Sequence, residues 1–386
     1  MNRVLILVNI TGLIIGISYG LHNPILPIFA KNVINATYSE LGLIGLANFI
    51  PYMFIPLFVG VLLDRFNNAY LLAFGTAINS VSVYLLSIAQ SVPEIMGMRI
   101  LTGVAHAFFW PPCESIISKE SSEKSRVKNI SWFTMFFVIG FMIGPLIGSA
   151  LLEGLDITYR ILFQITAFIL ATTIITALMA SKKNAKKNVE HFSFSSIKEM
   201  KKFPEVIILL IFCTSSFGII LTIYPAFLND SGMEDTDVLM LYFVFGISRV
   251  ISLAFAGKFA KRTSSTLIAA LFAVSIGLGI SVIADSIIMF GIALVLMGFG
   301  FSIFFPLTLE IILSKTKKVI SGKIIGAYET MFGIGWAIGP SLGGPITQTF
   351  GNQMPYIIFS IVGIMVAIIA IISRRNLEPQ KIENQS

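Results

Sequence analysis

The sequence predicts an all-α membrane protein with twelve transmembrane helices, arranged as two pseudo-symmetric six-helix bundles. Hydrophobic residues make up 55% of the 386 residues and charged residues only 12%, a balance that water-soluble domains of this size do not have. The apolar stretches are each about 20 residues long, which is enough for a helix to cross the hydrocarbon core of a bilayer. In addition, landmarks in the first half of the chain recur in the second half.

Twelve apolar stretches follow one another along the chain. They are continuous rather than alternating in polarity, and lipid admits only helices or closed barrels, so the stretches predict helices. The predicted spans are 4–31, 40–62, 70–90, 95–117, 129–151, 159–180, 205–228, 237–257, 264–284, 287–313, 322–346 and 353–373.

Basic residues concentrate in alternate loops, on one face of the predicted bundle. Arg65, Lys258, Arg262 and the run "KKNAKK" lie in such loops, whereas acidic residues prevail in the opposite loops. Lysine and arginine favour the cytoplasmic side, so we expect a multi-pass protein of the cell membrane with both termini in the cytoplasm. This bias explains the net charge of +7 and gives no reason to expect a nucleic-acid partner.

The two cysteines, Cys113 and Cys213, both lie within apolar spans. They predict neither a disulfide framework nor a metal site, and we expect no cofactor.

The longest polar stretch, at 181–204, divides the predicted spans into six and six. We interpret it as a cytoplasmic linker. It joins an N-terminal six-helix bundle (1–180) to a C-terminal six-helix bundle (205–373), which a cytoplasmic tail (374–386) follows.

The two halves share three landmarks at nearly constant spacing. The pattern Gly-x-x-x-Gly-Pro-x-x-Gly occurs in the fifth span and again in the eleventh. The loop segment "GVLLDRF" corresponds to "GKFAKRT", and "GVAHAFFWPP" in the fourth span corresponds to "GFGFSIFFPL" in the tenth. Secondary transporters use such repeats to build a binding site at the bilayer midplane. The residues of the repeated pattern are Gly140, Gly144, Pro145 and Gly148 in the first half, and Gly335, Gly339, Pro340 and Gly343 in the second.

These features resemble the major facilitator superfamily (MFS) over essentially the whole chain. Gly60, Asp64 and Arg65 are similar to the family's Gly-x-x-x-Asp-Arg loop signature, although "NNA" replaces its usual basic continuation. "RILTGVAHA" resembles the signature of span four, and "GFMIGPLIGS" resembles the span-five signature linked with exporters and antiporters. We therefore expect a monomeric transporter of the drug or metabolite exporter type.

The resemblance also implies gating roles for these motifs. Glycines four residues apart let another helix approach closely, a proline permits a bend, and the family places spans five and eleven between the halves. We interpret the two glycine-proline stretches as the surfaces along which the halves rock. By resemblance, Asp64 faces the positive N-terminus of span eleven near Ser321 and Gly322, as a latch of the inner side.

Charged and polar residues within the spans are candidates for substrate binding, because each costs free energy unless it faces water or a partner. Arg99, His106 and Trp110 share one face of span four, and we expect this face to line a central cavity. A carbonyl or carboxylate of a neighbouring span could equally hold Arg99. Arg249, near the middle of span eight, either binds an anionic group or pairs with Glu329, and we favour the pair.

Proton coupling has four candidate residues. His22, which we also expect near the cavity, can titrate close to neutral pH, although a lone intramembrane histidine is more often a packing residue. Glu114 and Glu329 are carboxylates within spans. Glu310 holds nearly the same place in the second half as Glu114 in the first, and this symmetry favours charges at the cytoplasmic edge for both.

The leading hypothesis is a secondary active transporter that exports a small organic molecule by alternating access, coupled to protons. A second hypothesis is uptake or exchange of an organic anion, which Arg99 and Arg249 suggest. A transport-inactive receptor or scaffold is disfavoured, because it would hardly keep the paired glycine-proline helices. An enzyme is not expected, since the sequence contains no nucleotide-binding glycine loop, metal cluster or nucleophile triad.

Overall fold

The computed structural model describes residues 2–181, 200–315 and 321–379, and the regular elements within these ranges are all helices. The first half contains α1 (Arg3–His22), α2 (Ile25–Asn32), α3 (Tyr38–Arg65), α4 (Asn68–Leu86), α5 (Val92–Ala107), α6 (Trp110–Glu120), α7 (Glu123–Gly154) and α8 (Tyr159–Met179). The second half contains α10 (Pro204–Thr222), α11 (Tyr224–Asp230), α12 (Asp235–Ala254), α13 (Ala256–Phe259), α14 (Thr263–Ile283), α15 (Ile287–Ser314), α16 (Ser321–Phe350) and α17 (Met354–Ile372). Short 3-10 turns follow α13 at Ala260–Arg262 and α17 at Arg374–Leu377.

Each predicted span corresponds to one helix or to a pair of helices in line. Ten helical segments in the described ranges are long and apolar enough to cross a membrane. The two other predicted spans are α16 and the interrupted pair α5–α6. The prediction of an all-α membrane protein with twelve spans is confirmed.

Three spans are broken by a segment that contains proline. Pro24, Pro111 and Pro225 stand at the starts of α2, α6 and α11. Proline has no backbone N–H and cannot continue the hydrogen bonds of the helix before it. The breaks at Asn23 and Ile223 occupy matching places in the first and seventh spans, so they belong to the repeat.

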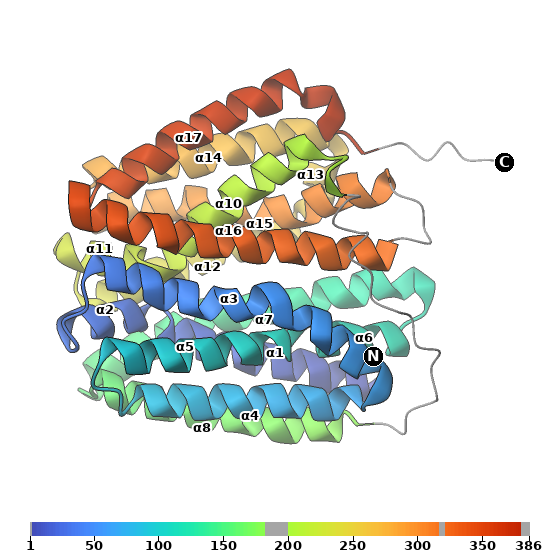
Figure 1. Ribbon diagram of the computed structural model, residues 1–386, viewed down its shortest axis with the longest axis horizontal. Coiled ribbons are helices and arrows are strands. Elements are labelled where there is room, and N and C mark those ends of the chain that lie inside the picture. The colour runs from blue at the N-terminus through green and yellow to red at the C-terminus, as the bar shows by residue number, and fades with distance from the viewer. Residues whose placement is uncertain (1, 182–199, 316–320, 380–386) are drawn as a thin grey trace.

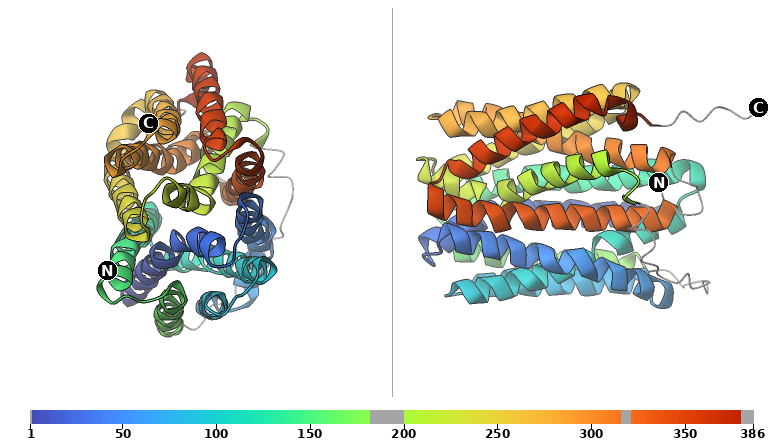
Figure 2. Two further views of the ribbon diagram at one scale, coloured as in Figure 1. Left: turned by 90° about the vertical axis from the view of Figure 1, so that its left-hand side faces the viewer. Right: turned by 45° about the horizontal axis from the view of Figure 1, so that its top comes forward.

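The helices form two bundles that lie side by side (Figure 1), as the view along the helix axes also shows (Figure 2, left). Within the first half α1 packs on α7, and α4 packs on α8; within the second half α10 packs on α16, and α14 packs on α15 and α17. Across the molecule, α3 packs on α16 and α7 packs on α12. These four helices form most of the interface between the halves, and α2 also meets α11 there.

The glycine-proline stretches bring two helices into contact within each half. A Cβ atom on Gly140 would lie 2.2 Å from the carbonyl oxygen of Leu13 in α1, and one on Gly339 would lie 2.0 Å from that of Ser215 in α10. Any side chain there would force the backbones apart. The other motif glycines that face α1 or α10 are Gly144, Gly335 and Gly343.

The same stretches also border the other half. Met142 and Pro340, which lie within them, contact α12 and α3. A Cβ atom on Gly246 of α12 would lie 2.7 Å from Met142, and one on Gly42 of α3 would lie 2.4 Å from the Pro340 carbonyl oxygen. Of the motif glycines, Gly148 is close to a side chain of α12. The motifs therefore join helices within a half and also contribute to the surface between the halves, and rocking along them stays a prediction.

Some expectations concern parts of the chain outside the described residues. The predicted linker at 181–204 and tail at 374–386 fall largely there. The latch predicted between Asp64 and the start of span eleven, near Ser321 and Gly322, involves residues whose side chains lie outside the described part of the structure.

We expect Gly140→Ala and Gly339→Ala each to lower the free energy of unfolding by about 1–3 kcal/mol, because the added methyl group overpacks a backbone contact. Thermal unfolding of the purified protein in detergent measures the effect. Gly97→Ala is the matched control, since a Cβ atom on this helical glycine meets nothing within 4 Å. Equal melting temperatures for all three variants would contradict the close-packing account.

Candidate functional site

Hydrogen bonds join the two halves at the end of the molecule opposite both termini (Figure 1). Asp230, the last residue of α11, pairs with Lys31 of α2 and accepts a hydrogen bond of 2.8 Å from the Tyr38 hydroxyl of α3. The side-chain amide of Asn32 donates to that of Asn229 at 2.8 Å. We call this the closed end.

The bonds at the closed end are individually weak. The Lys31–Asp230 pair is partly exposed, and an exposed ion pair contributes about 1 kcal/mol or less. Each neutral hydrogen bond adds about 0.5–1.5 kcal/mol. A closure made of several such bonds can be exchanged for another arrangement without breaking a packed core.

A cavity of about 210 Å³ lies between the halves. Side chains from α1, α3, α5, α6 and α7 of the first half and from α10, α12, α15 and α16 of the second line it. Most of the lining is apolar and aromatic, with a few polar groups among the rings. Because both halves supply its walls, any relative movement of the halves changes its shape and its access.

The charged residues of this cavity are ordered along the helix axes. At a helical rise of about 1.5 Å per residue, Arg99 lies roughly 10 Å from the closed end, Arg249 roughly 20 Å, and Glu114 and Glu329 roughly 30 Å. All four line the cavity. The cavity is therefore positive toward the closed end and negative toward the end that carries the termini.

Arg99 lines the cavity as expected and has no carboxylate partner among the described residues. It is 7% exposed, and its Nη1 atom donates to Asn23 Oδ1 at 3.3 Å, beside the break between α1 and α2. Its Nε atom has no hydrogen-bond partner in the described ranges. We weighed a structural partner against a ligand contact for Arg99. The Asn23 amide holds the side chain in place, and part of its hydrogen-bond donor capacity stays free for a ligand.

His106 stands in a line of polar aromatic side chains. Its Nδ1 atom lies 3.0 Å from the Tyr19 hydroxyl, which also accepts a hydrogen bond of 3.1 Å from Asn79. On the other side, the ring of Tyr52 meets the imidazole edge-on, with centroids 5.5 Å apart. The Tyr52 hydroxyl donates to Glu329 at 3.3 Å, so the line reaches from α4 in the first half to α16 in the second.

Glu114 and Glu329 face the cavity from opposite halves. Glu114 lies on α6 and Glu329 on α16, and both line the cavity. Two ionised carboxylates in one low-dielectric space repel each other, and a proton on either one removes this repulsion. A pair of this kind can take up and release one proton.

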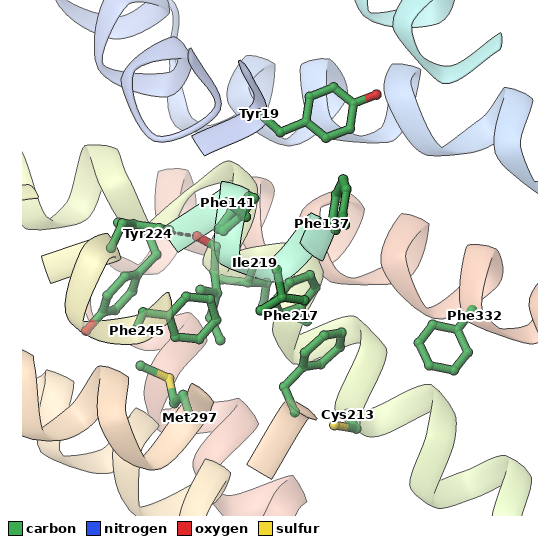
Figure 3. Close-up of a cluster of buried hydrophobic side chains, with 14 of the residues drawn as sticks. Tyr19, Phe137, Phe141, Cys213, Phe217, Ile219, Tyr224, Phe245, Met297 and Phe332 are labelled. Carbon is green, nitrogen blue, oxygen red and sulfur yellow. Dashed lines mark hydrogen bonds between the residues drawn. The ribbon is translucent and has the colours of Figure 1, made fainter. Parts of the chain in front are cut away.

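Arg249 lies among four phenylalanine rings and forms no ion pair with Glu329, which corrects the pair that we favoured from the sequence. Its guanidinium carbon is 5.3–5.5 Å from the ring centroids. The spacing along the helix axes explains the difference, because roughly 10 Å of helix separates the two levels. Three of the rings appear in Figure 3, where Phe141 faces Phe217 and Phe245. The four rings are those of Phe141, Phe217, Phe245 and Phe301.

The remaining candidates divide between the cavity and its surroundings. Trp110 lines the cavity and packs on Phe137, with centroids 5.1 Å apart. His22 is fully buried behind it, where Nδ1 lies 2.6 Å from the Ser18 carbonyl oxygen. Glu310 is exposed on α15 and does not line the cavity.

Several cavity residues are not among the sequence-based candidates, and three of them carry polar groups on large or central side chains. Tyr52 and Asn48 lie one turn apart on α3, and Asn48 accepts a hydrogen bond of 2.7 Å from Thr102. Trp336 stands inside the second glycine-proline stretch, and its buried Nε1 atom has no hydrogen-bond partner among the described residues. The polar pair at i and i+4 in the apolar second span was a usable signal for α3.

Gly60 and Arg65 of the loop signature do not line the cavity. Gly60 is exposed, and a Cβ atom at this position would meet nothing within 4 Å. Arg65 ends α3 as an exposed residue.

Comparison with known families decides the identity of the fold. The sequence profile of the Major Facilitator Superfamily matches residues 8–318 and 264–386. The chain belongs to the major facilitator superfamily. As an MFS transporter, it has the expected two-bundle architecture.

Among curated relatives, the quinolone resistance protein NorA of Staphylococcus aureus (strain MRSA252) is 25% identical over 134 residues. This segment covers 35% of the present chain and 34% of NorA, so the similarity spans about a third of either protein.

Solved MFS structures share the fold along nearly the whole chain. The nucleoside transporter NupG matches with a TM-score of 0.79 at 13% identity, covering 97% of this chain and 100% of its own. A bacterial homolog of the human lysosomal transporter Spinster, inward-facing and unoccupied, gives 0.78 at 13% identity, covering 98% of each chain. The human organic anion transporter MFSD10 (TETRAN) gives 0.69 at 13% identity, covering 95% and 99%. At such identities the likeness concerns the fold.

We expect Asp230→Asn to loosen the closed end, because it removes the ion pair with Lys31 and weakens the bond from Tyr38. A loss of about 1–2 kcal/mol changes the ratio of closed to open molecules about 5- to 30-fold. Spin labels at the exposed positions Val33 and Gln353 report the change as a longer, broader distance distribution.

Asp285→Asn, an exposed aspartate on the α14–α15 loop, is the control and should leave the Val33–Gln353 distances unchanged. Identical distributions for wild type and Asp230→Asn would show that Asp230 does not hold this end closed.

Proposed function

We propose that this MFS transporter exports a small organic molecule in exchange for protons. The observation that carries the proposal is the pair of carboxylates, Glu114 and Glu329, which face one cavity from opposite halves. Coupled transport requires a proton site and a substrate site in one cavity that opens alternately to the two sides of the membrane.

Tyr52 connects the protonation of Glu329 to the interface. Its hydroxyl crosses from α3 to Glu329 on α16, and these helices form one of the two contacts between the halves. A hydrogen bond to an ionised carboxylate contributes about 1.5–3 kcal/mol, and one to a neutral group about 0.5–1.5 kcal/mol. A proton on Glu329 therefore weakens a bond that ties the halves together.

Alternating access follows from the placement of the remaining contacts. The halves are bonded at the closed end, and the carboxylates lie nearer to the opposite end. We place the protein in a bacterial cell membrane with both termini in the cytoplasm, as the basic loops favour. The closed end then faces the outside of the cell. The domain boundaries 1–180 and 205–373 mark the moving bodies, and one chain supplies the whole cavity, so a monomer is sufficient.

The direction of transport is supported by the partial similarity to NorA. That protein is named for resistance to quinolones, and resistance is the result expected when a transporter removes a toxic compound. The carboxylate pair fits this direction, because protons entering the cell down their gradient can drive an outward flux.

We expect Glu114→Gln and Glu329→Gln each to abolish the dependence of transport on a pH gradient, because the amide cannot carry the proton. Flux of a fluorescent quinolone and of one- and two-ring organic acids is followed in proteoliposomes with and without an imposed gradient. Exchange without a gradient should persist in both variants.

Glu94→Gln is the control. Glu94 lies on α5 outside the cavity, where its carboxylate accepts a hydrogen bond from the Gln90 backbone. The proposal fails if the wild-type flux ignores the gradient for every compound, or if both cavity variants stay as responsive as Glu94→Gln.

A further inference from the structure

We infer that the transported molecule is a small aromatic acid, and that Arg249 binds its anionic group. The inference rests on the proposed function and names the substrate class of the same cavity. It concerns binding, and it holds for either direction of transport.

Arg249 is a buried cation whose hydrogen bonds are largely unused. The side chain is 8% exposed and lines the cavity. Nε donates to Ser302 Oγ at 3.4 Å, and neither Nη atom has a partner in the part of the chain that the structure describes. A charge within a membrane span is costly unless it is paired or faces a polar space, so the unfilled fork is a ready site for an anion.

The ring cage stabilises the cation without occupying its donors. Aromatic faces attract a guanidinium through their quadrupoles, by about 0.5–2 kcal/mol, while the N–H groups stay free in the plane of the fork. Phe141 of this cage lies on α7, across the interface from Arg249 on α12. Both halves therefore build the anion site, and their relative position affects it.

The order of charges fixes the orientation of the acid. Glu114 and Glu329 repel an anion from the end that carries the termini, whereas Arg99 lies beyond Arg249 toward the closed end. The carboxylates and Arg99 therefore both act on an acid group in the direction of the closed end, and Arg249 is the first cation that it meets on this path.

The walls and the volume fix the size of the rest of the molecule. The cavity holds about 210 Å³, whereas sites for drug-sized ligands span about 300–1,000 Å³. Trp336, Phe137 and Phe301 border this space. A body of one or two fused rings suits these walls, because planar rings stack on aromatic side chains.

The test compares ring acids with uncharged and cationic molecules of the same shape. Benzoate, 2-naphthoate and indole-3-acetate, with the amide and the primary ammonium analogue of each, are titrated into the purified full-length protein in detergent by calorimetry. We expect at least one acid to bind at least about tenfold more tightly than its amide, as a charge-assisted hydrogen bond provides, and the ammonium analogues to bind less tightly.

Arg249→Gln should bring the affinity for that acid down to that for its amide while leaving the amide unchanged, and Arg249→Lys should keep part of the difference. Arg160→Gln is the matched control. Arg160 also lies over a phenylalanine ring, Phe29 at 5.2 Å, but outside the central cavity, and this variant should bind like wild type.

The inference is overturned if no acid binds more tightly than its amide, if an ammonium analogue binds best, or if the preference survives Arg249→Gln. The wild-type comparison decides the first two results whether or not a variant folds. Because the titration uses no gradient, a failure here leaves proton-coupled transport standing, and a failure of coupling leaves this result standing.

Discussion

The contact of α1 with α7, and of α10 with α16, is the constraint on which the rest of the structure depends. At Gly140 and Gly339 a helix backbone lies where a methyl group would otherwise be. Close backbone contact makes each half a rigid unit, since interiors packed in this way change between discrete arrangements and do not deform gradually. Movement between the halves then falls to the surfaces where they meet, α3 on α16 and α7 on α12.

The polar chemistry is concentrated on those same surfaces. Tyr52 reaches Glu329 across one of them, and Phe141 borders Arg249 across the other. In the proposed mechanism, a proton on Glu329 and an anion at Arg249 therefore act at the two contacts that rearrange during transport. Coupling then needs no distant pathway, because each ligand binds where the two states differ.

Composition and repetition were enough to predict the class of fold, because span length and hydropathy are fixed by the bilayer. The face of span four that carries Arg99 and His106 on α5 and Trp110 at the start of α6 was also predictable, since helical periodicity places these residues together. Each of them lines the cavity.

Pairings between distant helices could not be predicted in this way. Arg249 and Glu329 both required partners, yet residue spacing within one helix does not show which other helices lie beside it. The rings around Arg249 come from four different helices. The orientation of the glycine faces was likewise open, because a glycine stripe predicts close packing without naming the helix that approaches.

Distances between spin labels at the end that carries the termini test the central claim most directly. One pair, Phe66 with Ile372, spans the halves, and a second, Phe66 with Met179, lies within the first half; all three positions are exposed. Between acidic and basic pH in proteoliposomes, we expect the distance across the halves to shift while the distance within the half stays fixed. Equal shifts in both pairs would contradict an account in which rigid halves move against each other.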